Sequence, residues 1–243
     1  MSIVKLQLTK LDIMAVQQIF VKCFKCSCMS GPFKELTKEQ MAKVDSNRTE
    51  LTYAKGEIIC KQGAFISNML FIKEGLVKFY LETKPNPTVI SVEKSGDFIG
   101  LQSLFEQNVF QYSVEALEDT EVCLVDIKIF EELILENAGF AAGIIKHINY
   151  DMIKLYDRFQ SQTQKQINGR FAELLLHLKN NIYEQNPFDL SISKKDMADI
   201  ISTSKESVSR MCTQLKREGI ISEKGRNVRI IDEEKLEQIS KFG

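Results

Sequence analysis

The spacing of hydrophobic and polar residues changes along the chain. From about residue 51 to residue 126, short apolar runs such as "NMLFIKEG" and "TEVCLVD" alternate with glycine-containing turns. Short strands separated by such turns are typical of an antiparallel barrel or roll. Just before this region, Thr37 and Gln40 have the capping-box spacing that begins a short helix. Because helical periods dominate the rest of the chain, we predict an α+β protein with an N-terminal β-roll.

A long amphipathic helix is predicted after the roll. Its apolar side chains recur at intervals of four and three residues with no proline among them, at Ala141, Ile145, Ile148, Met152, Leu155 and Phe159. A sustained stripe of this kind is typical of a helix–helix seam. Ile144, Tyr150, Ile153 and Tyr156 add apolar surface that a single partner would not cover. The helix could pack only on its own domain, but we expect the stripe to be a homodimer interface.

The pattern then changes to two short helices and a hairpin. Ser193 with Asp196 caps the first helix, Ser204 is the expected N-cap of the second, and Gly219 ends it. Within the second helix, an inward face is expected at Val208, Cys212 and Leu215. The segment "ISEKGRNVRII" predicts two short strands around a glycine turn. We therefore predict a winged helix-turn-helix.

Positive charge concentrates in this last region, although the formal net charge of the whole chain is −1. Residues 203–230 hold seven Lys and Arg against three Glu, a local excess of four cations. A basic segment on a helix-turn-helix and wing is typical of phosphate binding, whereas a merely solvated charged face would not require that spacing. We expect this region to bind double-stranded DNA through Ser204, Lys205, Glu206, Ser209, Arg210, Lys224 and Arg226.

These patterns divide the chain into three predicted parts. They are an N-terminal arm with the roll at 1–136, a dimerisation helix at 137–164 and the winged helix-turn-helix at 165–243. No apolar stretch is long enough to cross a bilayer, and the N-terminus lacks the apolar block of a signal peptide. We expect a cytoplasmic protein without a membrane partner.

The quoted residues resemble the Crp/Fnr family of bacterial transcription regulators across nearly the whole chain. The "GDFIG" turn is similar to that of the family's cyclic-nucleotide-binding-type roll, and "ESVSR" fits the E-x-x-S-R recognition-helix motif of its Fnr branch. The resemblance implies a homodimer that recognises TTGA-type half-sites and contacts RNA polymerase. Arg210 can bind guanine O6 and N7, Glu206 can accept from cytosine N4, and Ser209 can contact a base or a phosphate. Lys205 occupies a position where the cAMP-binding branch carries arginine.

The resemblance also bears on cyclic nucleotides. Family members that bind them carry a glutamate for the ribose after the "FIG" turn and an arginine for the phosphate about ten residues later. Here Leu101 stands in place of the glutamate, and no Lys or Arg occurs from Leu101 to Ser113. A buried cyclic phosphate would lack its strongest partner. We therefore expect the roll to bind neither cAMP nor cGMP.

Three of the six cysteines lie in "CFKCSC", at Cys23, Cys26 and Cys28. The resemblance to oxygen-sensing Fnr proteins implies a [4Fe–4S] cluster held by these thiolates and by Cys123 of "ALEDTEVC". The single residue between Cys26 and Cys28 departs from the longer gap of the family, and bridging two irons over so short a span is harder. Zinc, thiol redox chemistry and no cofactor remain alternatives. The other cysteines, Cys60 and Cys212, are assigned to packing.

Two other functional classes compete with a DNA-binding regulator. A thiol oxidoreductase could use Cys23 and Cys26 as a C-x-x-C pair, but the β-α-β context that activates such a pair is missing. A cyclic-nucleotide-binding regulatory subunit would need the ribose and phosphate partners that the roll lacks. Neither class explains the winged helix-turn-helix. We expect no enzymatic activity, and we assign His147 and His177 to helical, non-catalytic positions.

Overall fold

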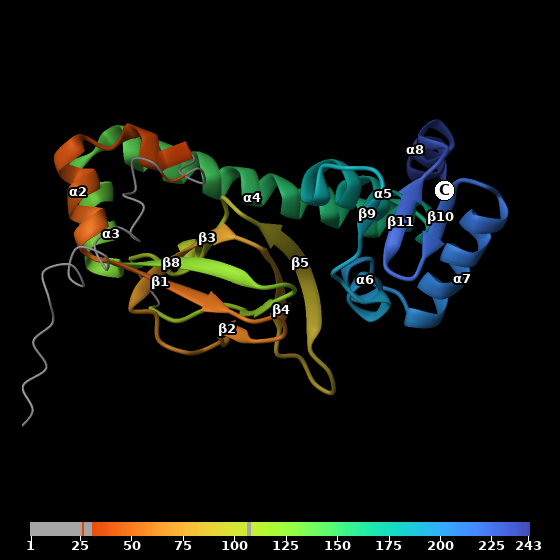
Figure 1. Cartoon of the computed structure of the whole chain (residues 1–243), viewed down its shortest axis with the longest axis horizontal. Helices are drawn as coiled ribbons and strands as arrows, with labels where there is room; N and C mark the ends of the chain where they lie inside the picture. Colours follow the sequence, from red (N-terminus) through yellow and green to blue (C-terminus); the bar gives the residue numbers. More distant parts are fainter. Residues whose placement is uncertain (1–25, 27–30, 106–107) are drawn as a thin grey trace, which may run out of the picture.

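The computed structural model describes residue 26 and residues 31–105 and 108–243. Figure 1 shows a β-roll, a long helix beside it and a helical domain at the C-terminal end. The strands of the roll are β1 (Arg48–Tyr53), β2 (Ile58–Cys60), β3 (Asn68–Glu74), β4 (Leu76–Leu81), β5 (Thr88–Lys94), β6 (Phe98–Ile99), β7 (Ser113–Ala116) and β8 (Thr120–Asp126). They form two antiparallel sheets, in the orders β1-β8-β3-β6 and β2-β7-β4-β5. The predicted roll is confirmed.

Three short helices close one end of the roll, and their bounds are η2 (Gly31–Glu35), α2 (Lys38–Ser46) and α3 (Ile127–Glu136). The predicted capping box begins α2: Gln40 N donates to Thr37 Oγ1 over 3.2 Å, and Thr37 N donates to Gln40 Oε1 over 3.1 Å. At the centre of this end lie five buried rings with centroids 5.1 to 6.5 Å apart. This phenylalanine cluster consists of Phe33, Phe71, Phe98, Phe130 and Phe140.

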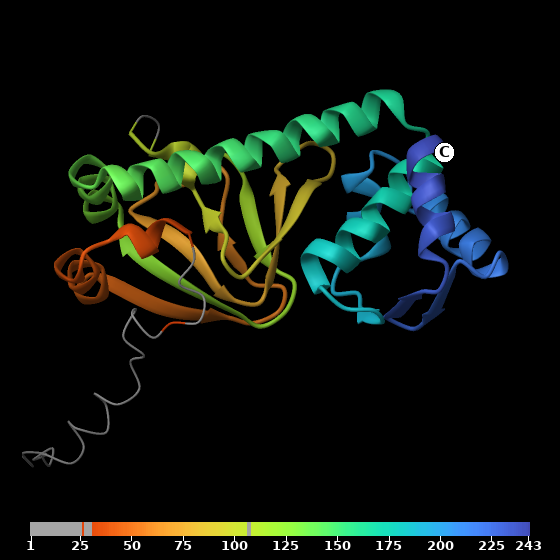
Figure 2. The same ribbon diagram turned by 90° about the horizontal axis from the view of Figure 1, so that it is seen from above.

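The long helix α4 (Ala138–Gln164) has 27 residues and therefore spans about 40 Å. Asn137 caps it by accepting from Phe140 N over 2.9 Å. Two glycines one turn apart, Gly139 and Gly143, let η2 cross α4 closely: a Cβ on Gly143 would lie 2.8 Å from the Cα of Pro32. Figure 2 shows α4 running along the whole roll and on into the C-terminal domain.

The C-terminal domain contains α5 (Ile167–His177), the π-helical turn η4 (Leu178–Tyr183), β9 (Phe188–Asp189), α6 (Lys194–Ile200), α7 (Lys205–Arg217), β10 (Ile221–Lys224), β11 (Asn227–Ile230) and α8 (Glu233–Phe242). Its sheet has the order β10-β11-β9. The structure confirms the predicted helix pair and wing hairpin. The edge strand β9 and the C-terminal helix α8, which packs on α5, were not predicted.

The winged helix domain is docked on the roll. Leu76, Val92 and Leu117 of the roll belong to the same buried apolar cluster as the core of the C-terminal domain. Polar contacts flank this apolar contact: Lys78 Nζ lies 3.5 Å from Asp196 Oδ1. The Lys94 ammonium also pairs with Glu184. Helix α6 of the C-terminal domain contacts β5 of the roll. The other helix of the pair, α7, lies on the side of the domain that faces away from the roll (Figure 1).

Candidate nucleic-acid interface

Helix α7 presents one face to the domain core and the other to solvent. It begins at Ser204, whose Oγ accepts from Ser207 N over 3.1 Å, and it is followed by Gly219 in the left-handed conformation, with φ of 72°. The predicted inward residues are all buried, and Met211 joins them: Val208, Met211, Cys212 and Leu215. Most residues of the opposite face are exposed to solvent.

The predicted DNA-contacting residues of α7 lie on its first two turns, at Ser204, Lys205, Glu206, Ser209 and Arg210. All of them are exposed except Ser209, which is half-buried. Arg210 Nη2 donates to Ser207 Oγ over 3.1 Å, which holds the guanidinium near the start of the helix. Backbone hydrogen bonding at the helix start, followed by the Ser204 hydroxyl, lowers the pKa of Glu206 and keeps it an ionised acceptor. In helix-turn-helix proteins, this end of the recognition helix contacts base edges.

The two predicted residues of the wing have different surroundings. Lys224 is exposed at the end of β10 and, among the described residues, pairs with no carboxylate. Arg226 instead donates through Nε to the carbonyl oxygen of Leu190 over 2.7 Å and through Nη2 to Ser191 Oγ over 3.4 Å. Arg226 thus holds the wing to the segment before α6. Sequence reasoning missed this contact because it joins residues 36 positions apart.

Ion pairs reduce the local positive charge but do not remove it. Glu223 pairs with Lys194 over 3.0 Å and with Lys216 over 3.3 Å. Two further exposed cations, Arg217 and Arg229, form no ion pair within the part of the chain that the structure describes. Sequence reasoning did not single them out, although they contribute to the local excess of cations.

The predicted seam of α4 is largely exposed on the single chain. The exposed fractions are 59% for Ile145, 62% for Leu155 and 67% for Phe159, and Met152 is also exposed. Three of the additional apolar residues, Tyr150, Ile153 and Tyr156, are exposed as well. Ala141 is half-buried, and Ile148 packs partly against the phenylalanine cluster. The seam is therefore concentrated in the second half of α4.

Side chains of the protein fill the interior of the roll near Leu101, which is itself buried. Tyr112 stacks on Phe79 with ring centroids 4.6 Å apart. Its hydroxyl accepts from Gly100 N over 3.1 Å and donates to Gln102 Oε1 over 2.9 Å. The backbone N–H of Gly100, the last residue of the "FIG" segment, is thus already bonded inside the protein. That the roll binds no cyclic nucleotide stays a prediction.

Two of the four candidate metal ligands, Cys26 and Cys123, are described, whereas Cys23 and Cys28 lie outside the described residues. Cys123 is half-buried on β8. Burial raises its pKa, the charge of Arg48 and a hydrogen bond from it oppose that effect, and the charges of Glu50 and Cys26 make smaller contributions that raise the pKa. Among the described residues no group of three or more His, Cys, Asp or Glu side chains could hold a metal. These two thiols are half of the predicted four-thiolate set, and no cluster chemistry follows from them alone.

The cysteines assigned to packing are both buried. Burial raises the pKa of Cys60 to about 12 and also raises that of Cys212. These thiols are protonated and inert near neutral pH.

Comparisons with known proteins agree with this architecture. A cyclic nucleotide-binding domain model matches residues 50–137, and a Crp-like helix-turn-helix domain model matches residues 169–239. Electron transport regulator A of Shewanella oneidensis is 23% identical over 89% of this chain and 89% of its own. The transcriptional activator protein Anr of Pseudomonas protegens is 22% identical over 73% of this chain and 75% of its own. The solved structure of FixK2 from Bradyrhizobium japonicum, 22% identical, superposes with a TM-score of 0.73 over 79% of this chain and 96% of that one.

The two domain matches together cover well over half of the chain, in the order roll and then helix-turn-helix. No helix among the described residues is long and apolar enough to span a membrane. The matched proteins are transcription regulators, which sets the oxidoreductase alternative aside. The chain belongs to the Crp/Fnr family of transcription regulators, with a helix-turn-helix that binds DNA.

Proposed function

We propose that the protein is a homodimeric, sequence-specific regulator that inserts the first turns of α7 into the major groove. The observation that carries this proposal is the exposed polar face of α7, with Arg210 held near the helix start by Ser207. In the major groove, a guanidinium can bond both O6 and N7 of one guanine, and a carboxylate can accept from cytosine N4. Arg210 and Glu206 supply these two groups. With Ser209 they form the E-x-x-S-R motif that favours a TTGA-type half-site.

Phosphate contacts would position α7 on the duplex. Lys205 at the helix start and Lys224 on the wing are both exposed cations on this side of the domain. Such contacts carry little sequence information but supply most of the salt-dependent affinity. We assign Arg226 a smaller part in DNA binding than its charge alone would indicate, because its guanidinium is bonded to Leu190 and Ser191.

Dimerisation is proposed through the exposed half of α4. Monomeric proteins rarely expose a continuous apolar surface made of several large side chains, as on this half of α4. Pairing Leu155 and Phe159 with the same residues of a second copy would cover that face around a two-fold axis. Such a dimer would present two α7 helices to half-sites about one helical turn of DNA apart.

The proposed localisation, partners and signal are inferred from the family to which the chain belongs. We propose activity in the cytoplasm, contact with RNA polymerase and no response to cAMP or cGMP. Redox or oxygen sensing through Cys23, Cys26, Cys28 and Cys123 is the sensory function to test first, because Cys26 acts electrostatically on Cys123. Zinc binding and the absence of any cofactor are the alternative outcomes of elemental analysis on protein purified without oxygen.

The test of DNA recognition compares Arg210→Ala with Lys224→Ala in binding selections from random duplexes. Wild type should select a palindrome of TTGA-like half-sites. Arg210→Ala should weaken binding by about 1–3 kcal/mol and lose preference at one guanine, because the bidentate contact is gone. Lys224→Ala should weaken binding to all sequences and reduce the salt slope. Unchanged base preferences in Arg210→Ala, or the absence of a palindromic site, would contradict the proposal.

A further inference from the structure

One carboxylate of the winged helix domain joins three of its elements. Glu223 lies on β10 of the wing, and its Oε1 is 3.0 Å from Nζ of Lys194, the first residue of α6. Its Oε2 is 3.3 Å from Nζ of Lys216 in the last turn of α7. This one side chain therefore links the wing to the beginning of α6 and to the end of α7.

The strand places Glu223 on the inner face of the wing hairpin. Successive side chains of a strand point to opposite faces, so Glu223 lies on the same face as Ile221, which is buried. Only 13% of the Glu223 side chain is exposed. Lys224, the next residue, points to the opposite face and is exposed. The carboxylate thus lies next in sequence to a proposed phosphate contact.

Two cations keep this carboxylate ionised although it is largely buried. Burial alone would raise the pKa of Glu223, but the hydrogen bond from Lys194 and the charges of both lysines hold that pKa below its usual value. Burial alone would lower the pKa of Lys194, and the hydrogen bond to Glu223 raises it above its usual value. At neutral pH the cluster therefore consists of two positive charges and one negative charge.

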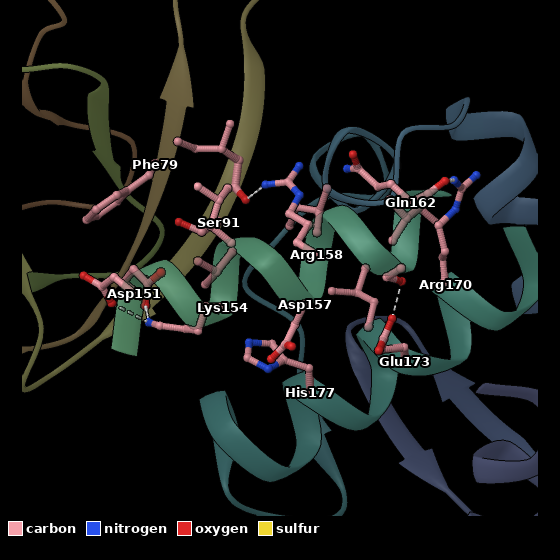
Figure 3. Close-up of a pocket in the computed structure, with 18 of the residues that line it drawn as sticks. Phe79, Ser91, Asp151, Lys154, Asp157, Arg158, Gln162, Arg170, Glu173 and His177 are labelled. Atoms are coloured by element: carbon pink, nitrogen blue, oxygen red, sulfur yellow. Dashed lines mark hydrogen bonds and ion pairs between the residues drawn. The ribbon is translucent and has the colours of Figure 1, made fainter. Parts of the chain in front are cut away.

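The other carboxylates of the domain pair with one cation or with none. Glu173, at the junction of α4 and α5, pairs with Lys165 and accepts from the Ser161 hydroxyl (Figure 3). Within residues 165–243, all of which the structure describes, Glu223 is the only carboxylate that pairs with two lysines. Its neutralisation would therefore free two ammonium groups beside the wing.

We propose that Glu223 is a positioning and specificity-determining residue for DNA binding. Its two ion pairs fix the wing relative to α6 and α7, so that Lys224 and the first turns of α7 meet one duplex in a defined arrangement. The same pairs withhold Lys194 and Lys216 from phosphates. This inference rests on the proposed function, in which α7 contacts bases and the wing contacts phosphates.

Withholding the two lysines favours specificity, because phosphate contacts do not depend on sequence. Each cation that neutralises a phosphate adds about 0.9 to the steepness of log affinity against log salt concentration. Such contacts carry no direct sequence information, whereas base-edge contacts do. Two free lysines would strengthen binding to every duplex, and a loosened wing would weaken binding to the correct one. Both effects would lower the ratio of specific to nonspecific affinity.

The test measures Kd over a series of salt concentrations, for a nonspecific duplex and for the duplex that wild type selects. Glu223→Gln should steepen the salt slope on nonspecific DNA by about 0.9–1.8, because one or two lysines gain a phosphate. Nonspecific affinity at low salt should rise about three- to tenfold, and the ratio of specific to nonspecific affinity should fall about tenfold. Glu223→Asp should stay closer to wild type in all three measures, because it keeps the charge.

Two further variants separate this role from net charge and from folding. Glu237 on α8 is exposed and forms no ion pair with any residue that the structure describes. Glu237→Gln changes the net charge by the same amount and should leave the slope unchanged. Glu223→Gln combined with Lys216→Met should return the slope toward the wild-type value, because a lysine that could gain a phosphate is gone. Circular dichroism at the binding temperature checks that each variant is folded.

An unchanged slope and an unchanged affinity ratio in Glu223→Gln would overturn the proposal, even with a lower melting temperature, since a merely structural ion pair predicts that result. An equal change of slope in Glu237→Gln would also overturn it, because net charge alone would then be responsible. If wild type selects no palindrome, the proposed half-site recognition fails. The slope of Glu223→Gln on nonspecific DNA still decides whether Glu223 withholds the lysines.

Discussion

The apolar residues of the two halves of α4 differ in burial, although the halves form one continuous helix. In the first half, Phe140 and Ile144 are buried against the phenylalanine cluster. In the second half, Leu155 and Phe159 are exposed, and a cavity lies alongside. Both halves have the same apolar spacing. The comparison shows that periodicity indicates an apolar face, whereas the neighbouring elements decide whether that face is core or free surface.

Removing a ring from the buried half should have the largest effect on stability. Phe140→Ala deletes a fully buried side chain that contacts Phe33 and Phe130, with ring centroids 5.7 and 5.3 Å away. We expect the free energy of unfolding to fall by about 3–5 kcal/mol in urea titrations. Phe159→Ala, made in a Leu155→Glu background to remove any dimer, should change it by less than about 1 kcal/mol. Equal losses at the two positions would show that the halves do not differ.

A charge in the exposed half should affect association rather than folding. Leu155→Glu should give a monomer in sedimentation experiments, because an exposed seam cannot close around a carboxylate. Its far-ultraviolet circular dichroism should match that of wild type, and its binding to a palindromic site should be much weaker. A wild-type protein that is monomeric both free and on DNA would refute the proposed seam.

The smallest effect, counted over one pH unit, is expected where β5 faces the middle of α4, because stability should depend on pH there. Burial of Glu93, with Asp97 and Asp151 nearby, raises its pKa from 4.5 to about 7 despite the 3.1 Å contact with Lys154. The folded state therefore holds a proton that the unfolded state releases between these two pH values. Stability from this group is greatest below pH 4.5 and falls, by at most about 1.4 kcal/mol per unit, as pH rises toward 7.

Comparing melting temperatures of wild type and Glu93→Gln between pH 5 and pH 8 isolates this contribution. The variant should lose it and become relatively more stable as pH rises. Identical pH profiles for the two proteins would exclude a shifted pKa at Glu93.

Local sequence signals predicted those parts of the fold that depend on residues a few positions apart. The capping boxes of α2 and α6, the start of α7 at Ser204 and the wing hairpin were all found in this way. Strand β9 has two residues and exists because Phe188 and Asp189 pair with β11, so it had no local signal. Helix α8 did have one, since the side chain of Asp232 caps it by accepting from Lys235 N over 2.9 Å.

Only those features of the candidate DNA interface that depend on residues a few positions apart could be predicted from the sequence. The exposure of Arg210 and Lys224 follows from the amphipathic pattern of α7 and the position of the wing turn. The bond of Arg226 to Leu190 depends on segments brought together by tertiary packing. No spacing rule within one element could indicate it.

The glycine pair of α4 fixes the register between two helices. Glycine inside a helix costs about 1 kcal/mol relative to alanine, so Gly139 and Gly143 lower the intrinsic helicity of α4. In return, η2 lies antiparallel on α4 with Glu35 above Gly139 and Pro32 above Gly143. If η2 moved by one helical turn toward the C-terminus of α4, Pro32 would lie on the ring of His147. That ring already packs edge-on against Phe98, with ring centroids 5.1 Å apart. The ring of His147 therefore blocks the next packing position for η2 in the direction of the C-terminus of α4.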